Sequence, residues 1–432
     1  MSIFDTLLRD VEIPAFASVR YEIKRGAITR ADVPGAVAET VARRRVMDRV
    51  RPGDVVAIAA GSRGINNHDE IVRSVARELL ARGAKPFIFP AMGSHGGATA
   101  EGQRDLLAGY GITGEAMGVP IVSSMETVQV GVTPHGLPVR IDAHAAAADW
   151  IVPVGRVKPH TDFRGRHESG LVKMLSIGCG KQYGANICHM QGFPNMARNI
   201  WEIAEAVLST GKVLFGLAII EDASHGTWSL TAVPGEAFDE EDAALLEEAK
   251  GLIPRIPFEK IDLLVLSEIG KDISGASMDP NITGRSAVMG SSRPFAERIV
   301  ALDLTDASHH NATGVGNADI TTRRLFEKMR FEDTYPNGIT SHEVASMKIP
   351  PVLPDDRSAL RMAIHTIVEG EPALGVRAVW LKNTLSMGGF LISENLIGQA
   401  ENIPGLSVRQ RGIQIAFDDQ GNVSPGFERY FH

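Results

Sequence analysis

The chain has 432 residues, of which 44% are hydrophobic and 22% are charged, and its formal net charge is −8. This length and composition are typical of a globular protein with two domains and a large core. The negative charge argues against a nucleic-acid partner, although a local cluster of Arg and Lys still suits a small anionic substrate.

The cysteine content and the apolar runs bear on where the protein works. Its two cysteines, Cys179 and Cys188, are too few for a disulfide framework and favour a reducing compartment. The first residues lack the apolar segment of a secretory leader, and no apolar run is long enough to span a bilayer. We therefore expect a cytoplasmic protein with no membrane partner. The composition leaves the oligomeric state open.

The first half of the chain alternates apolar strands with amphipathic helices. Weak extended pieces lie within residues 12–30, and strand pieces lie within 119–142. Further strands are predicted at 54–60, 86–90 and 150–154, and a hairpin at 213–221 and 228–233. Helices are predicted at 33–50, 68–83, 101–107, 195–209 and 238–250. This alternation predicts a parallel sheet with helices on both faces.

A proline-interrupted stretch, residues 253–257, marks the predicted domain boundary. Beyond it the pattern predicts strands at 261–267, 298–305 and 374–382 and helices at 319–330 and 356–368. The predicted fold class is α/β, with two α/β domains, mainly parallel sheets and an active-site cleft between them. The N-terminal domain, residues 1–255, carries the candidate catalytic residues. The smaller C-terminal domain, residues 256–432, closes the cleft.

Candidate site residues follow the ends of three predicted strands. Arg63 stands in a Gly-Ser-Arg-Gly loop, His95 in Gly-Ser-His-Gly-Gly, and His160 directly after Lys158-Pro159. Ligands bind at the carboxyl ends of parallel strands, where these loops would meet. A guanidinium grips a carboxylate with two parallel bonds, and two imidazoles suit proton transfer at one carbon or oxygen. The plainer alternative for each residue is a side chain bonded into its own turn.

Residues 155–191 hold the densest set of reactive side chains in the sequence. Lys173 lies in an otherwise apolar run, where a desolvated lysine loses charge readily and becomes a nucleophile. The alternative is a lysine that packs its stem and extends its head to water. His189 follows sixteen residues later, beside Cys188. One histidine alone makes no metal site, so a metal there needs further ligands from a cofactor.

This set of residues resembles the nickel-pincer-nucleotide lactate racemases and their homologues. That family has an Arg after an early strand, a G-[ST]-H loop about thirty residues on, and a P-H pair before a Gly-rich loop. A lysine and a histidine sixteen residues beyond it complete the frame. The matching positions are, in chain order, Arg63, Gly93-Ser94-His95, Pro159-His160, Lys173 and His189. The resemblance is clearest over residues 50–270.

The resemblance implies an isomerase that acts at C2 of a 2-hydroxy acid as a racemase or epimerase. Its cofactor would be a pyridinium mononucleotide with two sulfur arms and nickel, the nickel-pincer nucleotide, tethered to Lys173. The metal would be held by the cofactor and by His189. His95 and His160 would move the hydroxyl proton, and Arg63 would bind the substrate carboxylate. Such a cofactor also implies dedicated maturation enzymes as partners.

The sequence departs from the family in two places. Residues 161–171 form a loop about three residues longer and more charged than the family's, and Arg166 within it is a candidate contact for a larger substrate such as a sugar acid. Lys271, after the first strand of the second half, is near the family's second-domain lysine but out of register. It would suit the same anion as Arg63. The identity of the 2-hydroxy acid therefore stays open.

Two other functions stay open on the residues alone. In one, His95, His160 and His189 hold an ordinary divalent metal for hydrolysis or dehydration, and Lys173 is structural. In the other, the protein binds small anions or metal without catalysis.

Overall fold

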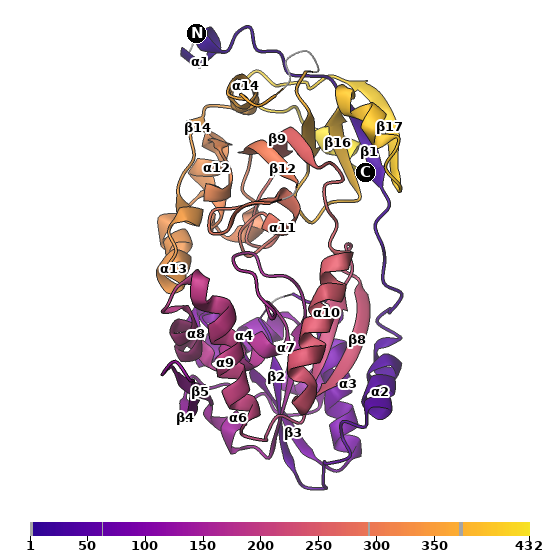
Figure 1. The fold of residues 1–432 in the computed structure, drawn as a ribbon, viewed down its shortest axis with the longest axis vertical. Coiled ribbons are helices and arrows are strands. Elements are labelled where there is room, and N and C mark those ends of the chain that lie inside the picture. The colour runs from indigo at the N-terminus through magenta and orange to yellow at the C-terminus, as the bar shows by residue number, and fades with distance from the viewer. Residues whose placement is uncertain (1–2, 63, 293, 371–374) are drawn as a thin grey trace. The chain divides into compact units, whose positions relative to one another are not determined.

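The computed structural model describes residues 3–62, 64–292, 294–370 and 375–432. The chain divides into two compact units, one of residues 25–252 and one that joins residues 1–24 to 253–432. Both units have the predicted α/β fold with mainly parallel sheets (Figure 1). Within the described ranges, no helix combines the length and apolarity that a membrane crossing requires.

The unit of residues 25–252 is built on a five-stranded sheet in the order β3-β2-β6-β7-β8. Its strands are β2 (Val55–Ala60), β3 (Lys85–Pro90), β6 (Trp150–Arg156), β7 (Phe215–Glu221) and β8 (Thr227–Pro234). The first four strands in the sheet order are parallel, and β8 pairs antiparallel with β7 as the predicted hairpin. The carboxyl ends of β2, β3 and β6 therefore lie at one edge of the sheet.

Helices cover both faces of this sheet, as the continuous apolar strands predict. Alternate residues of β2 enter different cores: Val56 and Ile58 belong to one buried cluster, and Ala57 and Ala59 to another. The helices are α2 (Val33–Arg44), α3 (His68–Ala81), α4 (Ala100–Gly109), α5 (Gly114–Met117), α6 (Ala143–Ala147), α7 (Leu171–Lys173), α8 (Lys181–His189), α9 (Met196–Leu208) and α10 (Phe238–Leu252). A separate hairpin consists of β4 (Thr127–Val132) and β5 (Pro138–Asp142).

The second unit is built on an eight-stranded sheet in the order β14-β13-β12-β9-β15-β16-β1-β17. Its strands are β1 (Phe16–Tyr21), β9 (Lys260–Leu266), β12 (Phe295–Ala301), β13 (Ile320–Thr322), β14 (Val352–Leu353), β15 (Ala378–Leu381), β16 (Gly389–Ser393) and β17 (Leu406–Ile413), with the short pair β10 (Arg285–Ser286) and β11 (Gly290–Ser291) beside it. Its helices are α1 (Ile3–Leu7), α11 (Pro280–Thr283), α12 (Arg323–Lys328), α13 (Phe331–Ser341), α14 (Asp356–His365) and α15 (Ile397–Ala400).

The N-terminal strand belongs to a different unit from the one expected. β1 pairs antiparallel with both β16 and β17, and its side chains alternate between the two cores of the second sheet. The predicted first domain, residues 1–255, therefore loses its first 24 residues to the other unit. Local pattern could not reveal this, because the partners of β1 lie some 370 to 390 residues further along the chain.

One predicted helix in the second half is wrong at its start. Residues 319–330 were expected to be helical, but Ile320–Thr322 form β13, parallel to β12. Three successive β-branched residues favour a strand. The helix α12 then begins at Arg323, where the Thr322 hydroxyl caps it by accepting the Leu325 N–H. Of the strand predicted at 374–382, β15 covers Ala378–Leu381, and residue 374 lies outside the described residues.

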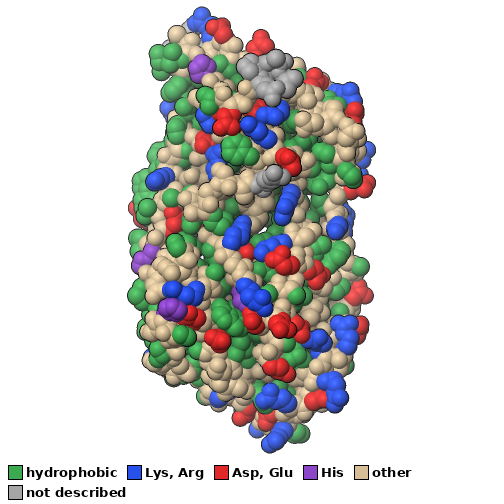
Figure 2. All heavy atoms as spheres, in the orientation of Figure 1, with side chains coloured by type: hydrophobic (Ala, Val, Ile, Leu, Met, Phe, Trp, Pro, Cys, Tyr) green, Lys and Arg blue, Asp and Glu red, His purple; other side chains and the backbone are tan. Residues whose placement is uncertain are grey.

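The surface carries charges of both signs. Figure 2 shows Lys and Arg side chains interspersed with Asp and Glu side chains over the visible face. This mixing accompanies the net charge of −8.

Candidate functional site

The loops that carry the predicted histidines begin at one edge of the sheet. Ala60 of β2 is aligned with Pro90 of β3 and with Val154 of β6. The chain leaves these strands toward Ser62, His95 and His160, respectively. Three loops that are far apart in the sequence thus start close together because the strands are parallel and in register, as predicted.

His95 sits in a glycine loop that needs its glycines. Gly96 and Gly97 have φ values of +62° and +63°, in the region where a side chain is strained. The imidazole Nδ1 of His95 is hydrogen-bonded to the Ser62 hydroxyl, which reaches it from the loop after β2. Tyr110 donates its own hydroxyl to the Ser62 carbonyl at 3.0 Å. Because a hydroxyl both donates and accepts, Ser62 can partner either tautomer of His95.

His160 is held by its own loop. Its backbone N–H donates to Glu168 Oε2 at 2.8 Å, and its ring packs on Phe163 with centroids 4.3 Å apart. Nδ1 accepts the Asp162 N–H at 3.0 Å, and the Asp162 carboxylate lies 3.7 Å from the same nitrogen. The hydrogen bond from the Asp162 N–H therefore favours the tautomer of His160 in which Nδ1 is unprotonated. At 3.7 Å the carboxylate is too far from Nδ1 for a hydrogen bond.

The charged loop of residues 161–171 is anchored to α10. His167 is buried and lies between Asp239 at 2.8 Å and Asp242 at 3.2 Å, stacked on Trp201. Glu168 is buried as well, and Lys250 of α10 lies 3.2 Å from it. Two of the charged residues that single out this loop in the sequence thus bind the protein's own helix.

Arg166 and Lys271, two predicted substrate contacts, have partners within the protein. The exposed Arg166 donates Nε to Asp239 Oδ1 at 2.7 Å. Lys271 belongs to the second unit, where its backbone N–H donates to the Ser308 hydroxyl at 2.9 Å and its Nζ donates to the Gly275 carbonyl. Arg63 lies outside the described residues. The substrate roles of these three residues stay predictions.

Residues 173–189 lie across the same edge of the sheet. A β-carbon on Gly61, directly after β2, would meet Met174 Sδ at 3.6 Å, and one on Gly155 of β6 would meet Met174 Cγ at 2.7 Å. A β-carbon on Gly93, in the His95 loop, would meet Ala185 Cβ at 2.9 Å. These glycines let the segment approach the strand ends closely. Lys173 and His189 are consequently carried on a segment that packs against the loops of the other candidates.

Lys173 and His189 occupy the two ends of this segment. Lys173 ends the single turn α7, and a π-helical stretch, Met174–Gly178, follows it at once. Such insertions are frequent at functional sites. His189 ends α8, with the Phe193 ring edge-on at 5.8 Å. Burial raises the pKa of the neighbouring Cys188 thiol to about 12, and the Lys173 ammonium is close enough to oppose that shift.

The histidines do not gather into a protein-only metal site. Among the residues that the structure describes, no group of three or more His, Cys, Asp or Glu side chains is arranged to hold a metal ion. A metal at His189 would need its other ligands from a bound group. One imidazole at the end of α8 and one half-buried amine fit a cofactor that brings most of the coordination itself.

Sequence reasoning missed three polar residues near the site, namely His68, Gln103 and Lys181. All three are buried. A periodic pattern places such residues on helices but does not tell which of them face inward at the edge of a sheet. His68 begins α3, and neither of its ring nitrogens has a hydrogen-bond partner among the described residues. Burial, together with the positive charge of Arg156, lowers its pKa to about 4, against the opposing effects of Asp69 and Glu221.

We expect this histidine to make the unit of residues 25–252 acid-sensitive. Between pH 6.5 and pH 4 the unfolded chain binds a proton at His68 that the folded chain does not, so stability falls as the pH falls. From pH 7 to pH 5 the loss from this one group is about 2 kcal/mol. His68→Phe should remove that part of the pH dependence. Urea unfolding at both pH values, followed by tryptophan fluorescence, measures it.

The comparison variant is His365→Phe, which replaces an exposed histidine of α14. It should keep the full wild-type pH dependence. Equal pH dependence in His68→Phe and wild type would show that His68 does not stay neutral in the folded protein.

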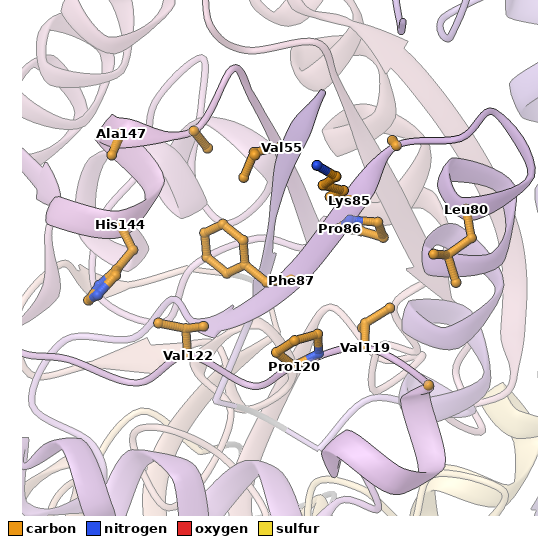
Figure 3. Close-up of a pocket in the computed structure, with 13 residues that line it drawn as sticks. Val55, Leu80, Lys85, Pro86, Phe87, Val119, Pro120, Val122, His144 and Ala147 are labelled. Atoms are coloured by element: carbon orange, nitrogen blue, oxygen red, sulfur yellow. The ribbon is translucent and has the colours of Figure 1, made fainter. Parts of the chain in front are cut away.

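A pocket of about 590 Å³ lies elsewhere on the same unit. Val55 and Lys85, the first residues of β2 and β3, help to line it, so it opens at the amino edge of the sheet. Figure 3 shows Phe87 among apolar neighbours such as Val122. Of the predicted site residues that the structure describes, none lines it.

The comparisons with known proteins are limited. Residues 56–236, less than half of the chain, match the family model described as a domain of unknown function, DUF362. No curated protein matches. The solved structure of the lactate racemase apoprotein from Thermoanaerobacterium thermosaccharolyticum is similar at 17% identity and a TM-score of 0.43. The match covers 59% of this chain and 66% of that one, just under two thirds. A similarity at this level carries no argument about chemistry.

Proposed function

We propose that this protein is a racemase or epimerase that acts at C2 of a 2-hydroxy acid. The observation that carries the proposal is that a family motif lies on a segment next to the loops of the two candidate bases. Lys173 and His189 have the sixteen-residue spacing of the nickel-pincer-nucleotide racemases, and their segment packs on the strand ends from which the His95 and His160 loops start. Tether, metal ligand and two bases would thus share one edge of one sheet.

Lys173 would hold the nickel-pincer nucleotide through its amine, and His189 would ligate the nickel. When bound, this cofactor supplies the acceptor for the C2 hydride. The half-buried position of Lys173 suits this role, because it leaves the amine within reach of a bound group, and a lysine amine can act as a nucleophile. Burial of the thiol at Cys188 keeps it protonated, so it offers no competing thiolate.

His95 and His160 would move the substrate's hydroxyl proton. Each ring is oriented by a neighbour, Ser62 for His95 and the Asp162 N–H for His160, and an imidazole can accept a proton and later return it. Two such groups on different loops can serve the two faces of one carbon. Arg63 would bind the carboxylate, with Arg166 as a further contact for a larger acid such as a sugar acid.

The proposal implies partners and a location. Dedicated maturation enzymes must supply the cofactor, and the natural setting is the cytoplasm, in keeping with two buried, unpaired cysteines.

The test begins with protein produced together with the cofactor-maturation enzymes. Intact mass should show an adduct on the chain, located at Lys173 by peptide mapping, with near-stoichiometric nickel. The loaded protein should interconvert the enantiomers of at least one acid in a panel of 2-hydroxy acids, followed by chiral chromatography. Stoichiometric zinc with no added mass would instead support a metal hydrolase or dehydratase. Binding of acids without stereochemical exchange would support a binding protein.

A further inference from the structure

The His95 loop, defined here as residues 91–97, is held from behind by one side chain. Gln103 of α4 is fully buried, and its Nε2 donates toward three carbonyls of this loop. They belong to Met92 at 3.2 Å, Gly93 at 2.9 Å and His95 at 3.3 Å. The amide group thus fixes the backbone on both sides of Ser94.

A buried lysine fixes the orientation of that amide. Lys181 has no exposed surface, and its Nζ donates to Gln103 Oε1 and to the Pro90 carbonyl, each at 2.7 Å. An ammonium group can only donate, so Gln103 must turn its oxygen to Lys181 and its NH₂ to the loop. The backbone of Lys181 has a φ of +57°, a strained value for a residue with a side chain. Placing the Lys181 ammonium there therefore costs backbone strain.

The charges around Lys181 indicate that a contribution to stability alone does not explain why a lysine is buried at this position. Asp142, at the end of β5, lies 3.9 Å away, and within the described part of the chain its Oδ2 has no hydrogen-bond partner. Burial lowers the pKa of Lys181 to about 8, although Asp142 and the Cys179 thiol oppose the shift. A buried ion pair of this kind is weak evidence for stability, because desolvation offsets much of the attraction.

We propose that Lys181 and Gln103 are positioning residues that lock the His95 loop to the segment of residues 173–189. Lys181 lies midway along this segment, eight residues from Lys173 and eight from His189. The lock would keep the candidate base at a fixed place relative to the candidate tether and metal ligand. The assignment of a base to His95 rests on the proposed function, but the lock itself does not.

The experiment measures the loop directly, in protein without cofactor. Hydrogen exchange followed by mass spectrometry is compared for wild type, Gln103→Leu and Lys181→Met. Losing the bonds to the loop carbonyls should raise exchange in peptides covering residues 91–99 by about tenfold or more, since a buried polar group left unpaired shifts an opening equilibrium by at least that factor. Peptides from α10 should be unchanged.

Lys212→Met is the matched control. Lys212 also donates to two carbonyls at the end of α6, those of Ala146 at 2.6 Å and Ala148 at 2.8 Å. These carbonyls lie just before β6, at the opposite edge of the sheet. This variant should loosen its own loop and leave residues 91–99 as in wild type. Unchanged exchange at residues 91–99 in Gln103→Leu and Lys181→Met, or an equal rise throughout the unit, would overturn the proposal.

Wild-type protein gives a second measurement that needs no variant. The titratable groups that face Lys181 are Asp142 from β5 and Cys179 from its own segment. Burial lowers the pKa of Lys181 to about 8 in the closed protein, so Lys181 binds a proton more tightly when the loop and its ammonium open together to water. Loop exchange, corrected for the intrinsic rate, should therefore fall between pH 7 and pH 9. A corrected rate that rises or stays flat would contradict a lock through Lys181 even if both variants failed to fold.

With loaded protein the same variants separate positioning from binding. Gln103→Leu should lower kcat by about 10²-fold while nickel content and KM stay near wild type. The two proposals can fail separately. If the variants show faster loop exchange but loaded wild-type protein racemises no 2-hydroxy acid, the proposed function is refuted and the lock stands.

Discussion

Replacing Lys173 with alanine should abolish the mass adduct and lower racemisation by at least about 10³-fold, because the amine that tethers the cofactor is gone. Lys173 is the half-buried lysine at the start of the π-helical stretch. Lys181, in the same segment, is fully buried and bonded to Pro90 and Gln103, so its amine is not available for a tether. Intact mass and chiral chromatography of protein matured in the same host measure both effects.

The control for this experiment is Lys85→Ala. Lys85 is an exposed lysine at the start of β3, at the other edge of the sheet, and its replacement should leave adduct and activity unchanged. Lys173→Arg adds a second comparison, since it keeps the positive charge and lacks the reactive amine. Full activity in Lys173→Ala would mean that the lysine is structural and that the proposed chemistry is wrong.

His95→Gln and His160→Gln should each lower racemisation by about 10²–10⁴-fold, the usual contribution of a positioned acid or base. Each variant should nevertheless still oxidise one enantiomer in a single turnover. The reason is that two imidazoles on separate loops would each serve one face of C2. When one imidazole is removed, the hydroxyl proton of the enantiomer served by the other still has an acceptor. Racemisation needs both.

The measurement mixes stoichiometric amounts of loaded variant and one enantiomer, quenches in acid and quantifies the 2-keto acid. The two variants should prefer opposite enantiomers. His135→Gln, a change in the turn between β4 and β5 where the ring pairs with Glu202, should behave like wild type. Oxidation of both enantiomers at the wild-type rate by both variants would exclude a two-base arrangement.

Much of the 25–252 unit could be predicted from local pattern. The strand at 54–60 is apolar throughout because helices cover both of its faces, and that composition is visible in the sequence. The helix at 68–83 could be predicted because its buried face repeats with helical spacing. Parallel strands also imply that the loops after them meet at one edge, which is how His95 and His160 could be placed near each other.

Partners that are remote in the sequence could not be predicted. The residues of β1 give no sign that they pair with β16 and β17, since strand pairing depends on complementary surfaces and not on local order. The charged loop of residues 161–171 suggested contacts to a larger substrate, but the side chains that pair with His167 and Glu168 lie on α10, about 70 to 80 residues away.

By itself, then, the sequence determined the fold class, the alternation of strands and helices, and the residue types at the strand ends, because burial and backbone preference act locally. Only the tertiary structure decided which polar groups hold those residues in place. Ser62 at His95, Asp162 at His160, and Gln103 with Lys181 behind the His95 loop follow from packing at the sheet edge. Buried polar groups must find their partners in three dimensions, so a linear pattern does not record them.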